Sequence, residues 1–514
     1  MNVCDTQSNN KRIAKNTFLL YVRMLLVMGI SLYTVRVVLY VLGEEDYGIY
    51  SVVGGIVLMF SFLNSSLASA SQRFFAFELG RNDLEKLGKI FGAMLFFYVI
   101  VCFVLLILVE VCGVWLLNEK LNIPASRMYA ANIVLQFSIL TFIIRMINTP
   151  FQAIIIANEK MNVYALVGIL EVLFQFVIVQ LLKFSSGDCL VQYAILITIN
   201  VLITSLCYIL YAKHNFKECT LKPIIDKKII IEIFKYSSWM MVYGFSEVAY
   251  IQGINMLLNI FFNATVNAAR AIAYQVYGAI KLFGLNFFKA VEPQMTKLYS
   301  NGELNRSFSL LIASSKYSFY LILVLSLPII THASFVLHIW LGEEIPNFTV
   351  PFTQLMLIDA MIGILGNPLG TMSRATGRIG KYSIIISLMY LINLPISYLF
   401  LKLGYSSICV FWIMILLCAV TILLRMILLK DQICDFSILR YLNEVIRPVL
   451  YICLFSSLIY IIFSHLCIDD MYGFILSSLS IVTLTLIGCF FLGLSALEKK
   501  YAIKYAKHLF KRTV

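Results

Sequence analysis

The chain has 514 residues, of which 61% are hydrophobic and only 13% are charged. A soluble domain carries about 45–50% apolar and about 25% charged residues, so this composition excludes a soluble multidomain enzyme and a disordered scaffold. The 40 Lys and Arg outnumber the 27 Asp and Glu, which gives a net charge of +13. In a membrane protein such an excess belongs to cytoplasmic loops, so it does not indicate a nucleic-acid partner.

Apolar runs long enough to cross a bilayer recur along the whole chain. A span needs about 20 mostly apolar residues, and the first run is too long for the core of a signal peptide. About fourteen spans are predicted on this length criterion, at 17–41, 49–72, 89–112, 127–148, 162–184, 190–212, 231–258, 264–288, 310–332, 349–371, 382–402, 407–429, 446–466 and 472–494. We therefore expect an all-α polytopic membrane protein.

The charges between the spans predict the topology. Lys and Arg gather in alternate loops, whereas the loops between them carry acidic residues such as Asp46, Asp188 and Glu343. The positive-inside rule then places both termini in the cytoplasm. Loops are short on both faces, so we expect no extramembrane domain. The basic segment 495–514 is predicted to lie as an amphipathic helix on the anionic cytoplasmic leaflet.

An internal repeat predicts two lobes. Pro150–Tyr164 can be laid on Pro368–Tyr382 at an offset of 218 residues, with Pro, Ala and Tyr at matching positions. Both lobes then start in the cytoplasm, as in parallel-repeat transporters with a central cleft. The predicted parts are an N-lobe at 1–212, a cytoplasmic linker at 213–230, a C-lobe at 231–429, two extra helices at 430–494 and the basic tail at 495–514.

Two cations inside a predicted span form the main candidate site. Arg270 and Lys281 are separated by three helical turns, so they lie within about 20° of each other, and Tyr274 and Tyr277 share their stripe. A charge at membrane depth costs about 2.5–3.5 kcal/mol even on the lenient insertion scale, so each needs a reason. One reason is that this ladder, about 16 Å tall, lines a water-filled cleft and attracts an anion.

The other reason is that the buried charges brace the helices by pairing. Glu247 and Asp359 are the possible partners of the two cations, and Glu171 is a third intramembrane carboxylate. Such carboxylates either pair with cations or bind a coupling ion, H⁺ or Na⁺. Arg23 and Arg36 in the first span either line the cleft or extend to the two interfaces. No catalytic constellation and no Walker motif occurs, so we expect neither an enzyme nor a cofactor.

Four segments carry a resemblance to a known family. They are Asn10–Asn16, Ser71–Phe75, Ala157–Tyr164 and, as the most specific, Leu42-Gly-Glu-Glu-Asp-Tyr-Gly-Ile-Tyr50. With them the whole chain resembles the O-antigen and capsular polysaccharide flippases of the Wzx type, in the MATE/MOP exporter superfamily. The resemblance implies alternating-access movement of an undecaprenyl-pyrophosphate-linked oligosaccharide from the cytoplasmic to the periplasmic leaflet.

The same resemblance implies the partners and the site. The partners are the lipid-linked glycan, membrane lipids and assembly proteins such as a polysaccharide polymerase. By helix and chemistry, the cleft-lining cations are Arg23 and Arg36 of the first helix and Arg270 and Lys281 of the eighth.

Three alternatives remain. A lipid II flippase shares the substrate chemistry, whereas a MATE-type drug exporter binds cations and needs an acidic cleft. A polytopic polysaccharide polymerase or lipid-linked glycosyltransferase normally carries a large periplasmic loop, and this chain has none.

Overall fold

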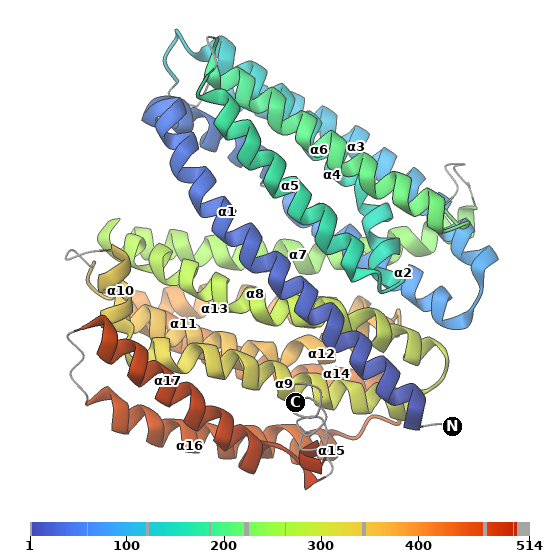
Figure 1. Cartoon of the computed structure of the whole chain (residues 1–514), viewed down its shortest axis with the longest axis vertical. Helices are drawn as coiled ribbons and strands as arrows, with labels where there is room; N and C mark the ends of the chain where they lie inside the picture. The colour runs from blue at the N-terminus through green and yellow to red at the C-terminus, as the bar shows by residue number, and fades with distance from the viewer. Residues whose placement is uncertain are drawn as a thin grey trace, which may run out of the picture. The chain divides into compact units, whose positions relative to one another are not determined.

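A computed structural model describes residues 3–58, 60–119, 123–184, 187–219, 226–262, 264–341, 346–465, 470–496 and 498–500. Almost all of these residues are helical and none lies in a strand, which confirms the predicted all-α fold (Figure 1). The helices are α1 (Val3–Leu58), α2 (Ser61–Arg81), α3 (Leu84–Glu119), α4 (Met128–Ala157), α5 (Met161–Leu182), α6 (Cys189–Asn215), α7 (Lys227–Phe261), α8 (Ala264–Ser300), α9 (Leu304–Thr331), α10 (Ala333–Leu341), α11 (Thr349–Ile364), α12 (Gly366–Ala375), α13 (Gly380–Lys402), α14 (Ile408–Gln432), α15 (Ile438–Tyr441), α16 (Arg447–Ser464) and α17 (Met471–Gly488), with π-helical turns η1 (Leu442–Ile446) and η2 (Cys489–Gly493).

Within the described residues, 10 helical segments are long and apolar enough to cross a membrane. They include α3 to α6, α9, α13 and α14 as single helices, and α11–α12, α15–α16 and α17–η2 as joined ones. The other predicted spans fall on α1, α2, α7 and α8, which are not among these ten segments. Of these, α8 carries Arg270, Gln275, Lys281 and Asn286 within 264–288. A count of fourteen spans therefore stays a prediction.

Helix α1 contains a sharp backbone break at the predicted loop after the first span. Gly43 has φ 77° and ψ 170° inside the bounds of the helix. This region of backbone space is essentially restricted to glycine. As a result, α1 covers the first predicted span and the beginning of the second, and α2 covers the rest.

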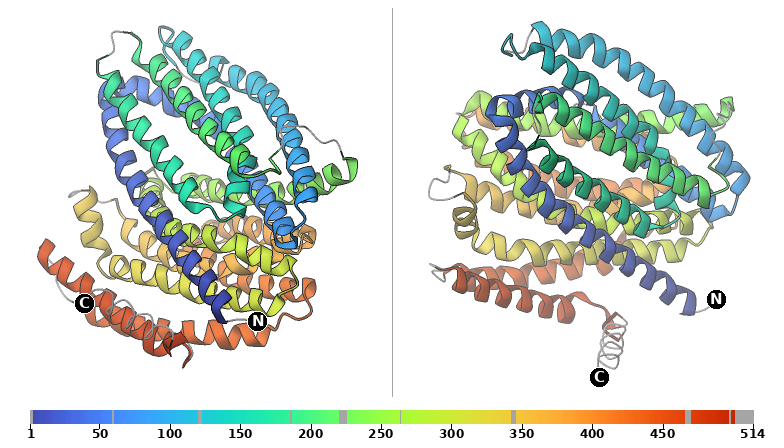
Figure 2. Two further views of the ribbon diagram at one scale, coloured as in Figure 1. Left: turned by 45° about the vertical axis from the view of Figure 1, so that its right-hand side comes forward. Right: turned by 45° about the horizontal axis from the view of Figure 1, so that its top comes forward.

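The chain forms two compact units. The first comprises Met1–Phe245 and Lys289–Glu303, and the second comprises Ser246–Phe288 and Leu304–Val514. Helices α7 and α8 thus contribute one part to each unit. In the first unit α4 packs against α2, α3 and α6, and α1 packs along α5. In the second unit α11, α13 and α14 pack together, and α16 and α17 lie side by side next to α9 (Figures 1 and 2). The lobe boundaries suggested by the repeat stay predictions.

The turn between α4 and α5 closely resembles the turn between α12 and α13. Helix α4 ends at Ala157 and α12 at Ala375, which are separated by the offset of the sequence repeat. At that same offset, Glu159 and Gly377 both have left-handed backbones, with φ 59° and 76°. The two units therefore turn the chain at this joint by the same local geometry.

Candidate functional site

The four residues of the predicted ladder lie in contact along α8. The Arg270 guanidinium carbon is 5.7 Å from the centroid of the Tyr274 ring. The Tyr274 and Tyr277 ring centroids are 5.6 Å apart, and Lys281 Nζ is 5.2 Å from the Tyr277 centroid. Positive charge thus lies against an aromatic surface at both ends of the stripe, an attractive arrangement for each cation.

Arg270 is directed into the second unit. Its side chain donates hydrogen bonds to Asn255 Oδ1 at 3.2 Å and to the Ile251 carbonyl at 2.8 Å, both on α7. Only 8% of the residue is exposed. Both acceptors are neutral, so they orient the guanidinium without cancelling its charge. Arg270 therefore braces α7 against α8 and leaves a positive potential on the stripe.

Lys281 has a looser environment and more exposure. Its Nζ lies 3.8 Å from Glu247 Oε1, and 34% of the side chain is exposed. That separation exceeds a normal hydrogen bond, so the pair is electrostatic only. Asp359 on α11 also interacts electrostatically with Lys281 and hydrogen-bonds Cys418. Both carboxylates that were expected to pair with the two cations, Glu247 and Asp359, thus interact with Lys281 rather than with Arg270.

A second cationic cluster lies in the first unit. The Arg23 guanidinium carbon is 4.6 Å from the centroid of the Tyr164 ring, and Lys289 Nζ is 3.9 Å from the same centroid. Lys289 also donates a hydrogen bond of 2.6 Å to the Tyr164 hydroxyl. Among the described residues, the buried Arg23 Nε has no hydrogen-bond partner. The side chain of Arg36 is outside the described residues.

The third intramembrane carboxylate is in a direct ion pair. Glu171 Oε1 accepts a hydrogen bond of 2.6 Å from Arg145 Nη2, and Asn200 donates to the Glu171 backbone carbonyl at 2.9 Å. These residues belong to α4, α5 and α6 of the first unit. Glu171 thus belongs to the first unit, whereas Glu247 and Asp359 belong to the second.

Sequence reasoning missed two members of the first-unit cluster, Tyr164 and Lys289. A signal for Tyr164 was present, because it matches Tyr382 in the repeat. In the second unit, the Arg425 guanidinium carbon lies 5.7 Å from the centroid of the Tyr382 ring. Each unit thus places a cation against the repeated tyrosine. Lys289 gave no such signal, since its proximity to Tyr164 depends on how α8 packs.

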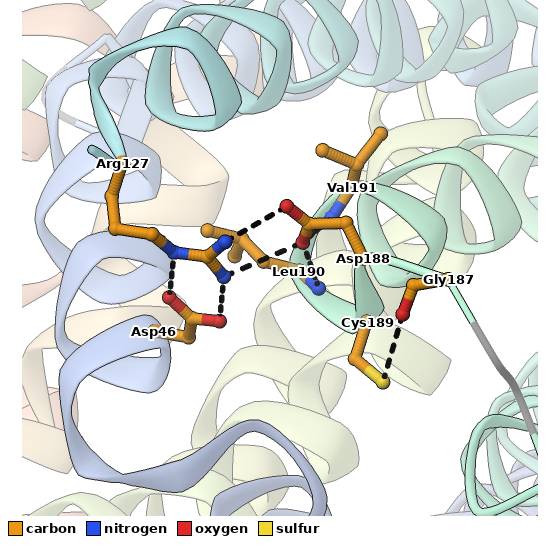
Figure 3. A network of polar contacts seen from close by, with 7 residues as sticks. All are labelled: Asp46, Arg127, Gly187, Asp188, Cys189, Leu190 and Val191. Carbon is orange, nitrogen blue, oxygen red and sulfur yellow. Dashed lines mark hydrogen bonds and ion pairs between the residues drawn. The ribbon is translucent and has the colours of Figure 1, made fainter.

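A polar network where α4 and α6 begin explains part of the Leu42–Tyr50 motif (Figure 3). Arg127 donates two hydrogen bonds to the Asp46 carboxylate, from Nε at 2.7 Å and from Nη2. It also donates to Asp188 at 2.9 Å. Asp188 caps α6 by accepting from the backbone of Leu190 at 3.1 Å. The hydrogen bond to Asp46 is the main reason that the pKa of Arg127 is raised above its usual value.

This network joins three segments of the first unit: α1 beyond its Gly43 break, the start of α4 and the start of α6. The motif residues Gly43 and Asp46 therefore have structural roles, the first permitting the break and the second holding the chain after it. Neither role requires a substrate.

A family model described as polysaccharide biosynthesis protein matches residues 13–299, more than half of the chain. The chain belongs to the polysaccharide biosynthesis protein family. No curated protein sequence matches it.

Solved structures show the fold of this polysaccharide biosynthesis protein. A crystal structure of MATE in the straight conformation has a TM-score of 0.71 and 16% identity, over 82% of this chain and 97% of that one. A MOP superfamily transporter from Pyrococcus furiosus, whose description reports a binding pocket of reverse polarity that suggests a different function, has a TM-score of 0.69 and 16% identity, over 82% and 96%. At such identities the likeness shows the fold alone, and that fold is the one of the MATE and MOP superfamily structures.

Proposed function

We propose that this protein is a flippase that moves an undecaprenyl-pyrophosphate-linked oligosaccharide from the cytoplasmic to the periplasmic leaflet of the bacterial inner membrane, by alternating access. The observation that carries the proposal is the match to the polysaccharide biosynthesis family in a chain with a MATE/MOP transporter fold. A transporter in polysaccharide biosynthesis needs a substrate that is made on one face of the membrane and used on the other. A lipid-linked glycan meets this requirement.

The diphosphate of such a substrate requires cations at membrane depth. Lys281 suits this role because a third of its side chain is exposed, and because its Nζ hydrogen-bonds Tyr277 while Glu247 stays at 3.8 Å, beyond hydrogen-bond distance. Arg270 suits a supporting role, since α7 holds both of its terminal nitrogens. We therefore assign the phosphate contact to Lys281, and the positive potential behind it to Arg270.

Arg23 and Lys289 are proposed as a second cationic site, within the first unit. They contact one aromatic ring, and the Nε of Arg23, which has no partner among the described residues, is a donor for an anion. Two neighbouring positive charges repel each other, so an anionic group bound to both would relieve that repulsion.

Coupling to H⁺ or Na⁺ is proposed to involve Asp359 with Glu247. Both interact with Lys281, so binding H⁺ or Na⁺ at either carboxylate would increase the net positive charge around Lys281, where the diphosphate is proposed to bind. Glu171 is the weaker candidate, because Arg145 already pairs with its carboxylate at 2.6 Å.

The alternatives predict different charges or different genetics. A cation exporter needs an acidic site, whereas the described stripe of α8 is cationic at both ends. A lipid II flippase would rescue a strain that lacks its own lipid II flippase. A polysaccharide polymerase would leave the lipid-linked unit on the periplasmic side when deleted.

The decisive test is deletion of the gene followed by complementation. Deletion should abolish the surface polysaccharide and leave lipid-linked glycan facing the cytoplasm. The Lys281→Ala variant should restore much less export than the native protein, and Arg270→Ala combined with Lys281→Ala should restore none. Lys213→Ala, on the exposed end of α6, is the matched control and should restore export. Normal export by the double variant would refute the assignment of the site.

A further inference from the structure

A buried ion pair joins the turn between α4 and α5 to the end of α8. Glu159 Oε1 lies 2.9 Å from Lys297 Nζ, and only 2% of the Glu159 side chain and 22% of the Lys297 side chain are exposed. Asn16 of α1 donates a hydrogen bond of 3.2 Å to the Glu159 backbone carbonyl. Three segments of the first unit that are far apart in the sequence therefore meet at this one residue.

The backbone of Glu159 has a conformation that does not suit its residue type. Its φ is 59°, in the left-handed region, where a Cβ is disfavoured and glycine is at ease. The matching position of the repeat is Gly377, with φ 76°. The second unit thus makes the same turn without this backbone cost. Such an outlier indicates that the side chain of Glu159 has a role.

Stability alone does not account for a glutamate at this position. A buried charge loses its hydration, and the attraction within a buried ion pair often does no more than offset that loss. Glycine, as at Gly377, would avoid both the desolvation and the left-handed Glu backbone. What the carboxylate does that glycine cannot do is hold Lys297 at 2.9 Å.

A second contact between the same two segments places one cation of the second cationic site. Tyr164, near the start of α5, accepts a hydrogen bond of 2.6 Å from Lys289, whose Nζ lies 3.9 Å from the ring centroid. Lys289 precedes Lys297 on α8 by about 12 Å along the helix and about 80° around it. Two contacts separated in both senses prevent a helix from sliding and from turning. The Glu159–Lys297 pair therefore helps to set where Lys289 lies.

The other cation of this site is placed in a different way. The Arg23 guanidinium carbon lies 4.6 Å from the centroid of the Tyr164 ring. A Cβ at Gly168, one turn further along α5, would overlap the same guanidinium. The surface of α5 thus has a recess that receives Arg23 directly. Lys289 has no such recess in α5, so its position depends on how the end of α8 is held.

We propose that Glu159 is a positioning residue for the second cationic site. Its ion pair with Lys297 fixes the end of α8 against α5, and this keeps the Lys289 ammonium on the Tyr164 ring together with Arg23. Two cations held on one ring suit an anion that carries more than one charge, such as a diphosphate. The diphosphate as ligand rests on the proposed function, whereas the contacts that hold Lys289 do not.

NMR of the full-length protein in nanodiscs measures the position of Lys289. Lysine ammonium groups are converted to ¹³C-dimethylamines, which keep their positive charge, and Lys289→Arg assigns the signal. A methyl group over an aromatic ring is shifted upfield, so the native Lys289 signal should lie upfield of exposed lysines. Glu159→Gly removes the carboxylate and also relieves the backbone, so folding is not at issue. The upfield shift should be lost in this variant.

Reversal of the ion pair provides the rescue. Glu159→Lys combined with Lys297→Glu keeps an attractive pair at the same place with the charges exchanged. The upfield shift of Lys289 should return in this double variant. It should stay absent in Glu159→Lys alone, because two lysines then face each other.

Binding of undecaprenyl diphosphate to the purified protein connects this position to the ligand. Lys289→Ala should raise the Kd roughly tenfold, as expected for the loss of one charge-assisted hydrogen bond. Glu159→Gly should raise it to a similar extent. The two changes together should cost no more than Lys289→Ala alone, because both act through one ammonium. Glu85→Gln, which breaks an exposed ion pair with Lys89 on α3, is the matched control and should leave the Kd unchanged.

Two results would overturn the proposal. One is an unchanged Lys289 signal in Glu159→Gly. The other is a Glu159→Gly and Lys289→Ala double variant that binds clearly more weakly than Lys289→Ala, because Glu159 would then act by another route. If the native protein does not bind undecaprenyl diphosphate, the proposed function fails, whereas the Lys289 signal still decides the role of Glu159.

Discussion

Asp46 and Asp188 share one arginine but should contribute very different stabilities. Asp46 receives two hydrogen bonds from Arg127 and its side chain is only 15% exposed. Hydrogen bonds between charged groups contribute about 1.5–3 kcal/mol when partly buried. Asp188 is 36% exposed, and an exposed pair contributes at most about 1 kcal/mol. Asn is as good a helix cap as Asp, so Asp188→Asn keeps the cap of α6.

Asp46→Asn should therefore lower the free energy of unfolding by about 2 kcal/mol, because the amide can accept only one of the two hydrogen bonds and presents its own donor to the guanidinium. Asp188→Asn should lower it by less than about 1 kcal/mol. The measurement is SDS-induced unfolding in bicelles, followed by tryptophan fluorescence. A double-mutant cycle of Asp46→Asn with Arg127→Gln should give a coupling energy of about 1.5–3 kcal/mol.

The test is the difference in unfolding free energy between Asp46→Asn and Asp188→Asn. If Asp188→Asn destabilises the protein as much as Asp46→Asn does, burial is not what separates the two pairs. A coupling energy near zero would show that Arg127 and Asp46 do not interact in the membrane-embedded protein.

Three further results are expected. Gly43→Ala should lower the free energy of unfolding by about 1–3 kcal/mol in the same SDS assay, because alanine disfavours the backbone of Gly43; an unchanged value would contradict the break in α1. Arg270→Ala should reduce the amount of folded protein, because it leaves Asn255 and the Ile251 carbonyl unpaired, whereas Lys281→Ala should reduce export at a normal amount of protein; immunoblots beside export assays would expose the reverse pattern. Burial alone would raise the pKa of Glu498, but hydrogen bonds from Lys316 and Ser495 outweigh it and lower the pKa below the usual 4.5. The Lys316–Glu498 ion pair, at 2.7 Å, therefore stabilises the segment 494–500 above that pH, and this stabilisation is lost as the pH falls through the lowered value. Hydrogen exchange at 494–500, corrected for its intrinsic pH dependence, should thus accelerate in acid in the native protein. It should not do so in Glu498→Gln.

The ladder could be predicted from sequence because it lies on one helix. Residues three, four and eleven apart must share a face, so the contacts from Arg270 to Lys281 follow from spacing alone. The sequence also predicted a loop between the spans 17–41 and 49–72, and the backbone break at Gly43 lies in that interval. Similarly, the composition sufficed for the helical fold.

The partners of these charges could not be predicted, because they depend on packing between distant segments. Asp46 and Arg127 are 81 positions apart, and Tyr164 and Lys289 are 125 apart. Spacing left open whether Arg270 pairs with a carboxylate, and in the structure its acceptors are instead an amide and a carbonyl on α7. Helices α3 and α4 also extend beyond the predicted spans, since helical hydrogen bonding continues into polar residues outside the apolar runs.

The most direct test of the proposed function is reconstitution. The purified protein would be inserted into vesicles that carry undecaprenyl-diphosphate-linked oligosaccharide in both leaflets, and an added glycosidase would degrade the glycan exposed outside. With active protein, the glycan of the inner leaflet should also become accessible, and vesicles with Lys281→Ala should degrade only the outer half. If the inner pool stays protected with the native protein under an imposed H⁺ or Na⁺ gradient of either direction, the protein is not a flippase for this class of substrate.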